Sequence, residues 1–222
     1  MNSNFPDSVS IKGRVRVCLE LLKKQNIKNK VIVDIGSSFG WLEKEIINEK
    51  PRRIIGIEPN EDAVAFAKKN VKAEFVVGDA LNIPLKDSCA DIVILFDVLE
   101  HVPVNTEEKA LKEAYRILKD RGILLLSTPN DNLFSNTLDP AWYFGHRHYS
   151  SDLIKSFLKQ AGYELEGIKV RGNIISCLYL VWFYLLKSVM KIKSPSNDFI
   201  ESLDDGGYEG EGILDIFLVA RK

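Results

Sequence analysis

The sequence predicts an α/β fold in which a seven-stranded, mostly parallel β-sheet carries helices on both faces. Short β-branched runs alternate along the chain with longer segments whose apolar residues recur at helical spacing. The connections between them are short, and parallel neighbours in a sheet need a crossover that is usually a helix. With 222 residues, 45% of them hydrophobic, the chain is long enough for one well-buried domain.

Strands and helices are expected in alternating order. The predicted strands cover residues 30–35, 53–58, 74–79, 90–96, 123–127, 163–170 and 213–220. The predicted helices cover residues 8–25, 41–48, 61–70, 106–118 and 151–161.

The first elements follow from local patterns. Residues 8–25 mix apolar positions with lysines and arginines, which predicts an imperfect amphipathic helix. The run 30–35 ends in glycine and serine, which indicates a buried strand that enters a tight turn. After the second strand, Pro59-Asn60 turns the chain into the helix at 61–70.

The later elements carry clearer boundary signals. Gly122 ends the helix at 106–118 before the fifth strand begins. The helix at 151–161 has serine at its start and Gly162 just beyond its end, as helix caps require.

The chain is expected to form a single domain over residues 1–222. Residues 1–28 would form an N-terminal helix or cap, and 30–170 the core. Residues 172–212 would be an insertion, part apolar and part polar, between the last two strands. No internal repeat or linker interrupts this organisation.

One segment of the insertion is strongly apolar. Ile174 to Leu186 carries no charge, but it is shorter than the roughly 20 residues that a membrane-spanning helix needs. A buried helix, a lid over an apolar pocket, a dimer face and a peripheral membrane contact through residues 174–190 are all compatible with this pattern.

The composition limits which partners and which cellular compartment are expected. The 30 basic and 31 acidic residues give a net charge of −1, so no overall field favours nucleic acid. The three cysteines form no C-x-x-C pair, which fits a reducing compartment. Because the N-terminus lacks an apolar signal-peptide core, we expect a cytoplasmic protein.

Acidic residues mark the ends of four predicted strands: Asp34, Glu58, Asp79 and Asp97. In an open parallel sheet, ligands bind in the crevice at the carboxyl ends of the strands. Gly36 and Gly40 allow a tight turn and a close approach of the backbone to a ligand. A carboxylate at Glu58 can accept hydrogen bonds from both hydroxyls of a ribose. Together these features predict a nucleoside site.

The glycine spacing restricts the kind of nucleoside. Gly36-Ser37-Ser38-Phe39-Gly40 does not match the G-x-G-x-x-G of dinucleotide sites, and the chain has no P-loop motif. An NAD-dependent oxidoreductase is therefore the weaker alternative.

Five segments in order resemble the motifs of class I S-adenosylmethionine-dependent methyltransferases: residues 31–40, 55–60, 77–85, 91–102 and 116–122. Ser38 stands where the first motif has its middle glycine. The resemblance covers about residues 30–170 and implies a Rossmann-like, doubly wound sheet whose C-terminal strand is antiparallel. It also implies S-adenosylmethionine as cofactor and S-adenosylhomocysteine as product.

The resemblance also implies a role for each motif residue. The methionine end of the cofactor would be held by Asp34 and the backbone of Gly36, Ser37, Ser38, Phe39 and Gly40. Glu58 would take the ribose, and Pro59 would pack on the adenine. Asp79 and Ala80 would address the adenine amine and ring, while Phe96 and Asp97 would border the sulfonium and the methionine amino group.

The three histidines are candidates for catalysis. A hydroxyl acceptor benefits from a general base that titrates near pH 7, which histidine provides. His101 follows the fourth strand, whereas His146 and His148 follow the fifth. The alternative is that they pack in their loops. Arg147 is a candidate partner for an anionic group of the substrate.

Asp97, Glu100 and His101 form an Asp-x-x-Glu-His spacing. It resembles the Glu-x-x-Glu-His motif that holds a divalent ion in ubiquinone-biosynthesis and small-RNA methyltransferases. A helical turn would place the three residues on one face. Aspartate replaces the first glutamate, so no metal is expected.

The expected reaction is methyl transfer to a small-molecule or lipid-like acceptor at a hydroxyl oxygen. The alternative from another class is a module that binds S-adenosylmethionine without catalysis. The sequence leaves the acceptor atom and the oligomeric state open, a homodimer included.

Overall fold

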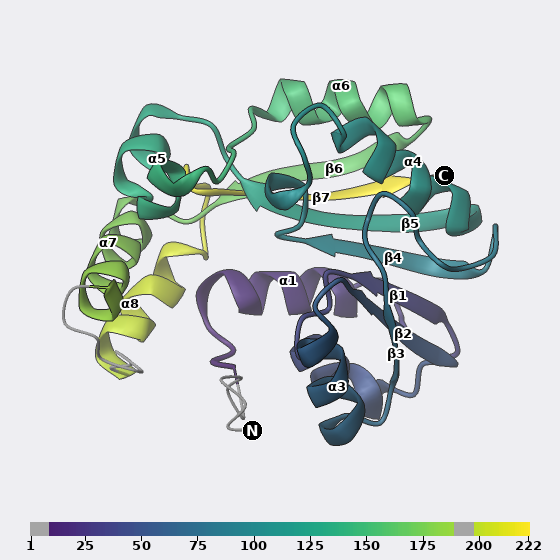
Figure 1. Ribbon diagram of the computed structural model, residues 1–222. Helices are drawn as coiled ribbons and strands as arrows, with labels where there is room; N and C mark the ends of the chain where they lie inside the picture. Colours follow the sequence, from purple (N-terminus) through teal and green to yellow (C-terminus); the bar gives the residue numbers. More distant parts are fainter. Residues whose placement is uncertain (1–8, 189–197) are drawn as a thin grey trace.

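A computed structural model of the chain describes residues 9–188 and 198–222 (Figure 1). Within these residues, seven strands form one sheet in the order β3-β2-β1-β4-β5-β7-β6. The strands are β1 (Val31–Ile35), β2 (Arg53–Glu58), β3 (Glu74–Val77), β4 (Ala90–Phe96), β5 (Leu118–Pro129), β6 (Glu164–Arg171) and β7 (Asp215–Arg221). β1 to β5 pair in parallel, and β7 runs antiparallel to both β5 and β6. The predicted fold class is confirmed.

The described helices lie on both faces of the sheet and beyond one of its ends. They are α1 (Gly13–Lys23), α2 (Trp41–Ile46), α3 (Glu61–Asn70), α4 (Glu107–Ile117), α5 (Leu133–Leu138), α6 (Ser151–Ala161), α7 (Ile174–Ser188) and α8 (Asp198–Gly207), with short 3-10 helices η1 (Ile47–Glu49), η2 (Leu99–His101) and η3 (Pro140–Phe144).

Alternation of side chains along the strands creates a core on each face. On β1, Val33 and Ile35 pack in the core beneath α4 and α6, while Ile32 packs in the core beneath α1 and α2. Helices α1 and α3 lie on one side of the sheet in Figure 1, and α4 and α6 on the other. The parallel strands are therefore covered on both faces, as their apolar sequences require.

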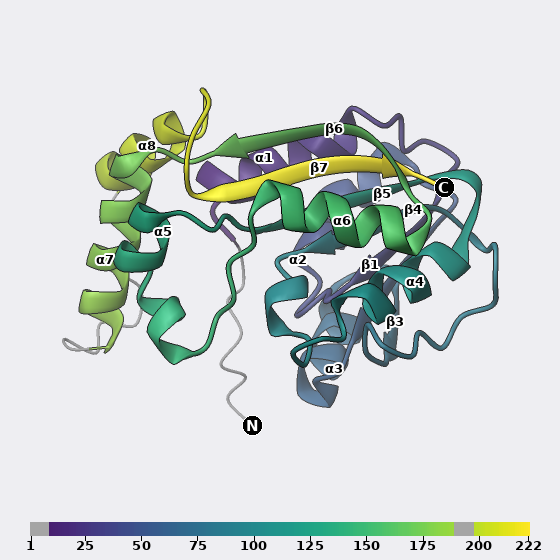
Figure 2. The same cartoon turned by 90° about the horizontal axis from the view of Figure 1, so that it is seen from above.

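The carboxyl ends of the parallel strands share one edge of the sheet. Because β6 and β5 are both antiparallel to β7, β6 also ends at this edge and β7 begins there. Helices α5, α7 and α8 cluster beyond it (Figures 1 and 2). The loops after β1, β2, β4 and β5 and the insertion thus meet at one end of the molecule.

Several boundaries differ from the sequence prediction. β5 begins at Leu118 instead of Ile123, because Leu118 pairs with Ala90 across an irregularity in the ladder. Helices α5 and α8 lie where no helix was expected. α8 forms in the glycine-rich part of the insertion because it packs against α7 and α1, while Phe199 and Leu203 on α8 stay exposed. Residues 1–8 of the expected N-terminal cap and 189–197 of the insertion lie outside the described residues.

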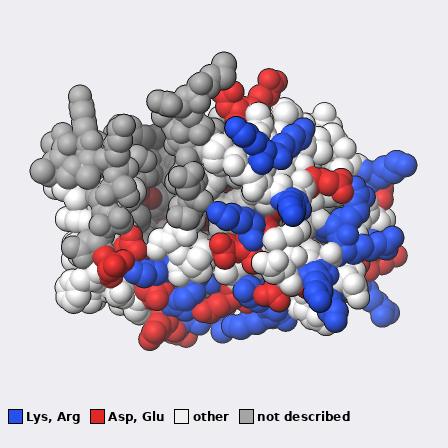
Figure 3. Space-filling view, turned by 90° about the horizontal axis from the view of Figure 1, so that it is seen from below, with Lys and Arg blue, Asp and Glu red and all other residues white. Residues whose placement is uncertain are grey.

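The length of the helices and the distribution of surface charge concern two expected partners, a membrane and nucleic acid. Within residues 9–188 and 198–222, no helix is both long and apolar enough to cross a bilayer. On the face shown in Figure 3, basic and acidic side chains are interspersed, and they form no broad surface of one sign.

Candidate cofactor and catalytic site

The loop after β1 turns through left-handed backbone conformations. Gly36, Ser38 and Gly40 have φ angles of 82°, 50° and 83°. A Cβ atom on Gly36 would lie 2.5 Å from Cγ2 of Val98, so glycine is required there by close packing as well as by conformation. Ser38 adopts the conformation that the missing motif glycine would favour, at a modest cost in backbone strain.

Two strand-end carboxylates are oriented by backbone donors. Glu58 accepts hydrogen bonds from the amides of Ser38 and Asn60, each at 3.0 Å, and thereby ties the loop after β1 to the end of β2. Asp79 accepts from the amides of Leu81 at 2.7 Å and Asn82 at 3.1 Å. Carboxylates fixed in this way are preorganised acceptors for hydroxyl or amine donors of a ligand.

Two cavities adjoin at this loop, and both are lined by Gly36, Ser38 and Asp97. The larger cavity, of about 530 Å³, is lined among others by Glu58, Pro59, Asp79, Ala80, Val98 and His101. The smaller cavity, of about 220 Å³, is lined among others by Arg14, Asp34, Phe39 and Phe96. Ser37 and Gly40 line neither cavity, because Ser37 is buried beneath the loop and Gly40 begins α2 against Phe75.

Arg14 joins the site from α1, far from the motifs in sequence. Its Nε lies 3.1 Å from Oδ2 of Asp97, and Ser127 donates to Oδ1 of Asp97 at 2.9 Å. Arg14 also lies 3.8 Å from the buried Asp215, whose pKa burial raises to about 6. No pattern in the sequence singled out Arg14, because its partners lie just after β4 and at the start of β7.

The structure brings two of the three histidines together. The rings of His101 and His146 have centroids 4.4 Å apart at an angle of 77°. Partial burial is the main cause that lowers the pKa of both, and the other histidine lowers that of His146 further. His101 lines the larger cavity, so a neutral imidazole lies beside the strand-end carboxylates at pH 7.

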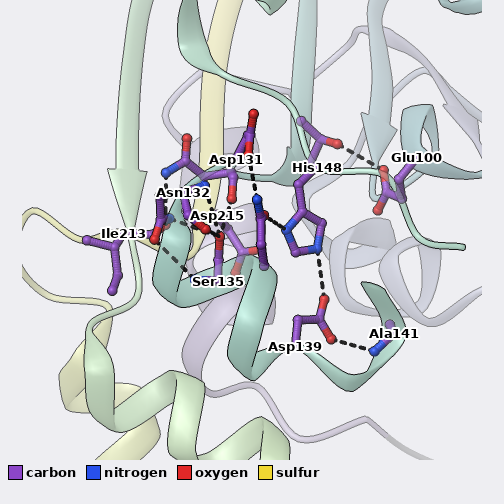
Figure 4. Close-up of polar contacts among 12 residues, drawn as sticks. Glu100, Asp131, Asn132, Ser135, Asp139, Ala141, His148, Ile213 and Asp215 are labelled. Atoms are coloured by element: carbon purple, nitrogen blue, oxygen red, sulfur yellow. Dashed lines mark hydrogen bonds and ion pairs between the residues drawn. The ribbon is translucent and has the colours of Figure 1, made fainter. Parts of the chain in front are cut away.

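The third histidine, His148, contacts Asn136 and Asp139 and is not part of the His101–His146 contact. Its Nδ1 lies 2.8 Å from Oδ1 of Asn136, and its Nε2 lies 3.0 Å from Oδ2 of Asp139. Figure 4 shows the buried ring directed at Asp139. With both ring nitrogens against oxygen atoms, His148 orders the segment after β5 and has no free nitrogen for a substrate.

Arg147 and Tyr149 hold the η2 loop in place. Arg147 donates to the carbonyl oxygens of Leu99 at 2.8 Å and Val102, and it pairs with Glu107. The hydroxyl of Tyr149 donates to Leu99 O at 2.9 Å. The guanidinium therefore positions the loop that carries His101, and a substrate anion on Arg147 stays a prediction.

The Asp97, Glu100 and His101 spacing does not form one face. Asp97 has a φ of 54°, which breaks the expected helical turn before η2 begins. Asp97 is engaged by Arg14, while Glu100 points into the protein and accepts from Thr128 at 3.1 Å. Among residues 9–188 and 198–222, no group of three acidic, histidine or cysteine side chains is arranged to hold a metal ion.

Glu100→Gln is expected to raise the melting temperature at pH 8 by about 5 °C, the effect of about 2 kcal/mol in a chain of this size. Burial, with a contribution from Asp97, raises the pKa of Glu100 from 4.5 to about 8. A raised carboxyl pKa gives stability that is complete below pH 4.5 and is lost as the pH rises through 8. Thermal unfolding from pH 4 to 9 measures this difference.

Glutamine mimics the protonated carboxyl, so the variant and the wild type should nearly coincide at pH 4. Glu164→Gln, on an exposed part of β6, is the matched control and should follow the wild type throughout. Parallel curves for Glu100→Gln and wild type from pH 4 to 9 would contradict the assignment.

Comparisons with known proteins find similarity to methyltransferases. A family model described as a methyltransferase domain matches residues 33–126. The protein named "Probable S-adenosylmethionine-dependent methyltransferase" of Mycolicibacterium smegmatis is 31% identical over 137 residues, which cover 61% of this chain and 52% of that protein. Demethylmenaquinone methyltransferase of Thermotoga maritima is 25% identical over 214 residues, which cover 94% of this chain and 82% of that protein.

Solved structures share the fold. The crystal structure of a SAM-dependent methyltransferase from Archaeoglobus fulgidus has a TM-score of 0.65 and 18% identity, and the match covers 94% of each chain. The chain spans about half the length of the mycobacterial relatives that it matches. These matches identify residues 33–126 as a methyltransferase domain, and the structure has the fold of the class I S-adenosylmethionine-dependent methyltransferases. S-Adenosylmethionine is the cofactor of this family, and S-adenosylhomocysteine is its product.

Proposed function

We propose that this chain transfers the methyl group of S-adenosylmethionine to a hydroxyl oxygen of a small-molecule or lipid-like acceptor. The observation that carries this proposal is the larger cavity, which His101 lines together with Glu58 and Asp79. This cavity contains carboxylates oriented to accept hydrogen bonds from a nucleoside. It also contains a neutral imidazole that can take the proton of the hydroxyl group to be methylated.

The residues present fit the cofactor. Glu58 would accept from the ribose hydroxyls, Asp79 and Ala80 would address the adenine, and Pro59 would pack on it. In the smaller cavity, Arg14 offers a cation for a carboxylate, and Asp34 and Asp97 offer anions for an ammonium group. This division of charge matches the amino-acid end of S-adenosylmethionine, with Phe39 and Phe96 as its apolar walls.

The cofactor supplies a methyl group activated by a positively charged sulfur, so the chain mainly aligns the acceptor and removes its proton. We assign proton removal to His101, assisted by His146. The ring of His146 packs on that of His101, and burial is the main cause that lowers the pKa of His101. His148 has a structural role in this proposal.

The insertion supports an apolar acceptor. Leu178 and Leu185 on α7 are 55% and 52% exposed, and Phe199 on α8 is 70% exposed. The Thermotoga relative acts on demethylmenaquinone, according to its name. We therefore propose that α7 contacts an amphipathic acceptor or the membrane surface that carries it. Residues 189 and 190 of the predicted contact lie outside the described residues.

Two experiments test the proposal. S-Adenosylhomocysteine should raise the melting temperature and NAD should not, which separates a methyltransferase from an oxidoreductase. Methyl transfer from labelled S-adenosylmethionine to a panel of hydroxylated quinone precursors, sugars and lipids should then identify an acceptor. Tight binding of S-adenosylhomocysteine with no turnover on the panel would favour a module that binds the cofactor without catalysis.

The contact by α7 is tested with exposed positions. Leu178→Ser with Leu185→Ser should lower turnover of an amphipathic acceptor presented in vesicles and leave binding of S-adenosylhomocysteine unchanged. Val104→Ser, on another exposed apolar position of 67%, serves as the control. Equal turnover by the double variant and wild type would remove α7 from the acceptor site. We further propose that the chain forms a single domain and is located in the cytoplasm. A sedimentation measurement would distinguish a monomer from a homodimer.

A further inference from the structure

Two buried carboxyl groups lie beneath the glycine loop. Asp34 on β1 is 5% exposed, and Glu43 on α2 is fully buried. Neither oxygen of Glu43 has a hydrogen-bond donor, and the hydroxyl of the adjacent Ser37 has no partner either. A Cβ atom on Gly56 would lie 2.6 Å from the Ser37 hydroxyl and 2.8 Å from Oε1 of Glu43, so all three groups crowd against β2. No sequence pattern singles out Glu43.

The missing donor is a proton. Two ionised carboxylates in contact, away from water, are strongly unfavourable, and one shared proton supplies a hydrogen bond between them. Burial raises the pKa of Glu43 to about 8. Burial and then the charge of Glu43 raise the pKa of Asp34 well above its usual range. The two groups titrate as a pair that retains a proton at neutral pH.

The pair opens to the site on one side only. Asp34 lines the smaller cavity, whereas Glu43 lies behind it in α2. The charged groups that face the pair are Glu58 from β2, whose charge adds to the effect on Asp34, and Arg14 and Asp97 across the cavity. Arg14 is held by Asp97, so it does not neutralise Asp34.

We propose that the Asp34–Glu43 pair holds a proton in the cofactor-free protein and releases it to solvent when the ammonium group of the cofactor binds. The ammonium then donates a hydrogen bond to Asp34 and brings a positive charge beside the pair, which favours ionisation of the pair. Glu43 is a positioning residue that makes cofactor affinity depend on pH. This inference rests on the proposed cofactor site.

Calorimetry measures the released proton directly. Titration of S-adenosylhomocysteine at pH 7 in buffers of different ionisation enthalpy should show release of about one proton per ligand bound, and affinity should rise up to about tenfold per pH unit between pH 6 and 7. 5′-Methylthioadenosine has the same nucleoside but no ammonium group, and it should bind without proton release. Equal proton release for both ligands would overturn the inference.

Glu43→Gln separates the pair from other titrating groups. The amide keeps the shape of the side chain and donates to Asp34, so Asp34 is ionised before binding. The variant should bind S-adenosylhomocysteine with almost no proton release and a flat pH profile. The matched control Glu45→Gln, exposed on the same helix, should behave as wild type.

The outcomes separate this inference from the proposed function. Wild-type proton release by a folded Glu43→Gln protein would overturn the role of the pair while the cofactor site stands. Failure of the wild type to bind S-adenosylhomocysteine would overturn the cofactor site and this inference with it. If Glu43→Gln fails to fold, the proton release measured for the two ligands with the wild-type protein still tests the inference.

Discussion

Glu58→Ala is expected to weaken binding of S-adenosylhomocysteine about 100-fold. In the proposed site Glu58 is a charged acceptor for two ribose hydroxyls, and loss of such hydrogen bonds costs roughly 3 kcal/mol in total. The same carboxylate accepts from the amide of Ser38, so its removal also loosens the loop that borders both cavities. Isothermal titration calorimetry measures the change.

Two variants control this result. Glu58→Gln keeps a single carbonyl acceptor and should lose less affinity than Glu58→Ala. Glu61→Ala removes an exposed carboxylate from the first turn of α3, outside both cavities, and should bind as wild type. Affinity of Glu58→Ala within threefold of wild type would show that the nucleoside lies elsewhere.

His101→Ala is expected to lower kcat by about 100-fold or more on the acceptor identified in the panel, with little change in cofactor affinity. General-base catalysis contributes typically 100- to 10,000-fold. Because burial lowers the pKa of His101 below 6.5, wild-type activity should rise with pH through the acid range and level off before neutrality. The variant should lose this inflection.

The neighbouring histidines provide the comparison. His146→Ala should lower kcat less and shift the inflection upward, because His101 loses a ring that packs on it and its burial, which lowers its pKa, is reduced. His148→Asn should lower the melting temperature, since it disrupts contacts with Asn136 and Asp139, and leave kcat within about threefold. A normal kcat for His101→Ala would assign proton removal to another group or to none.

Local patterns were sufficient for most of the fold. The strand at Arg53–Glu58 and the helices at Glu61–Asn70 and Ser151–Ala161 have the predicted bounds, because periodicity and caps coincide there. The start of β5 was missed because Leu118 joins the strand only through its pairing with Ala90. α8 was missed because its helix depends on packing against α1 and α7, which compensates for two glycines at its end.

Some residues of the candidate site could likewise be predicted from the sequence, and others could not. Glu58, Asp79 and Asp97 could be predicted because residues at the carboxyl ends of parallel strands converge whatever the rest of the chain does. Arg14 and Glu43 could not, because an arginine and a glutamate on helices have the pattern of solvent-exposed charges. Only their burial and their partners on other elements reveal them.

By itself, the sequence determined that this protein has a doubly wound sheet with a glycine loop and strand-end acids. These features depend on period, spacing and backbone conformation within single segments. The tertiary structure decided which histidine faces the cavity, that Arg147 supports a loop, and that Asp34 and Glu43 lie buried together beneath the glycine loop. Those properties arise from contacts between distant segments, where burial and neighbouring charge determine the chemistry of a side chain.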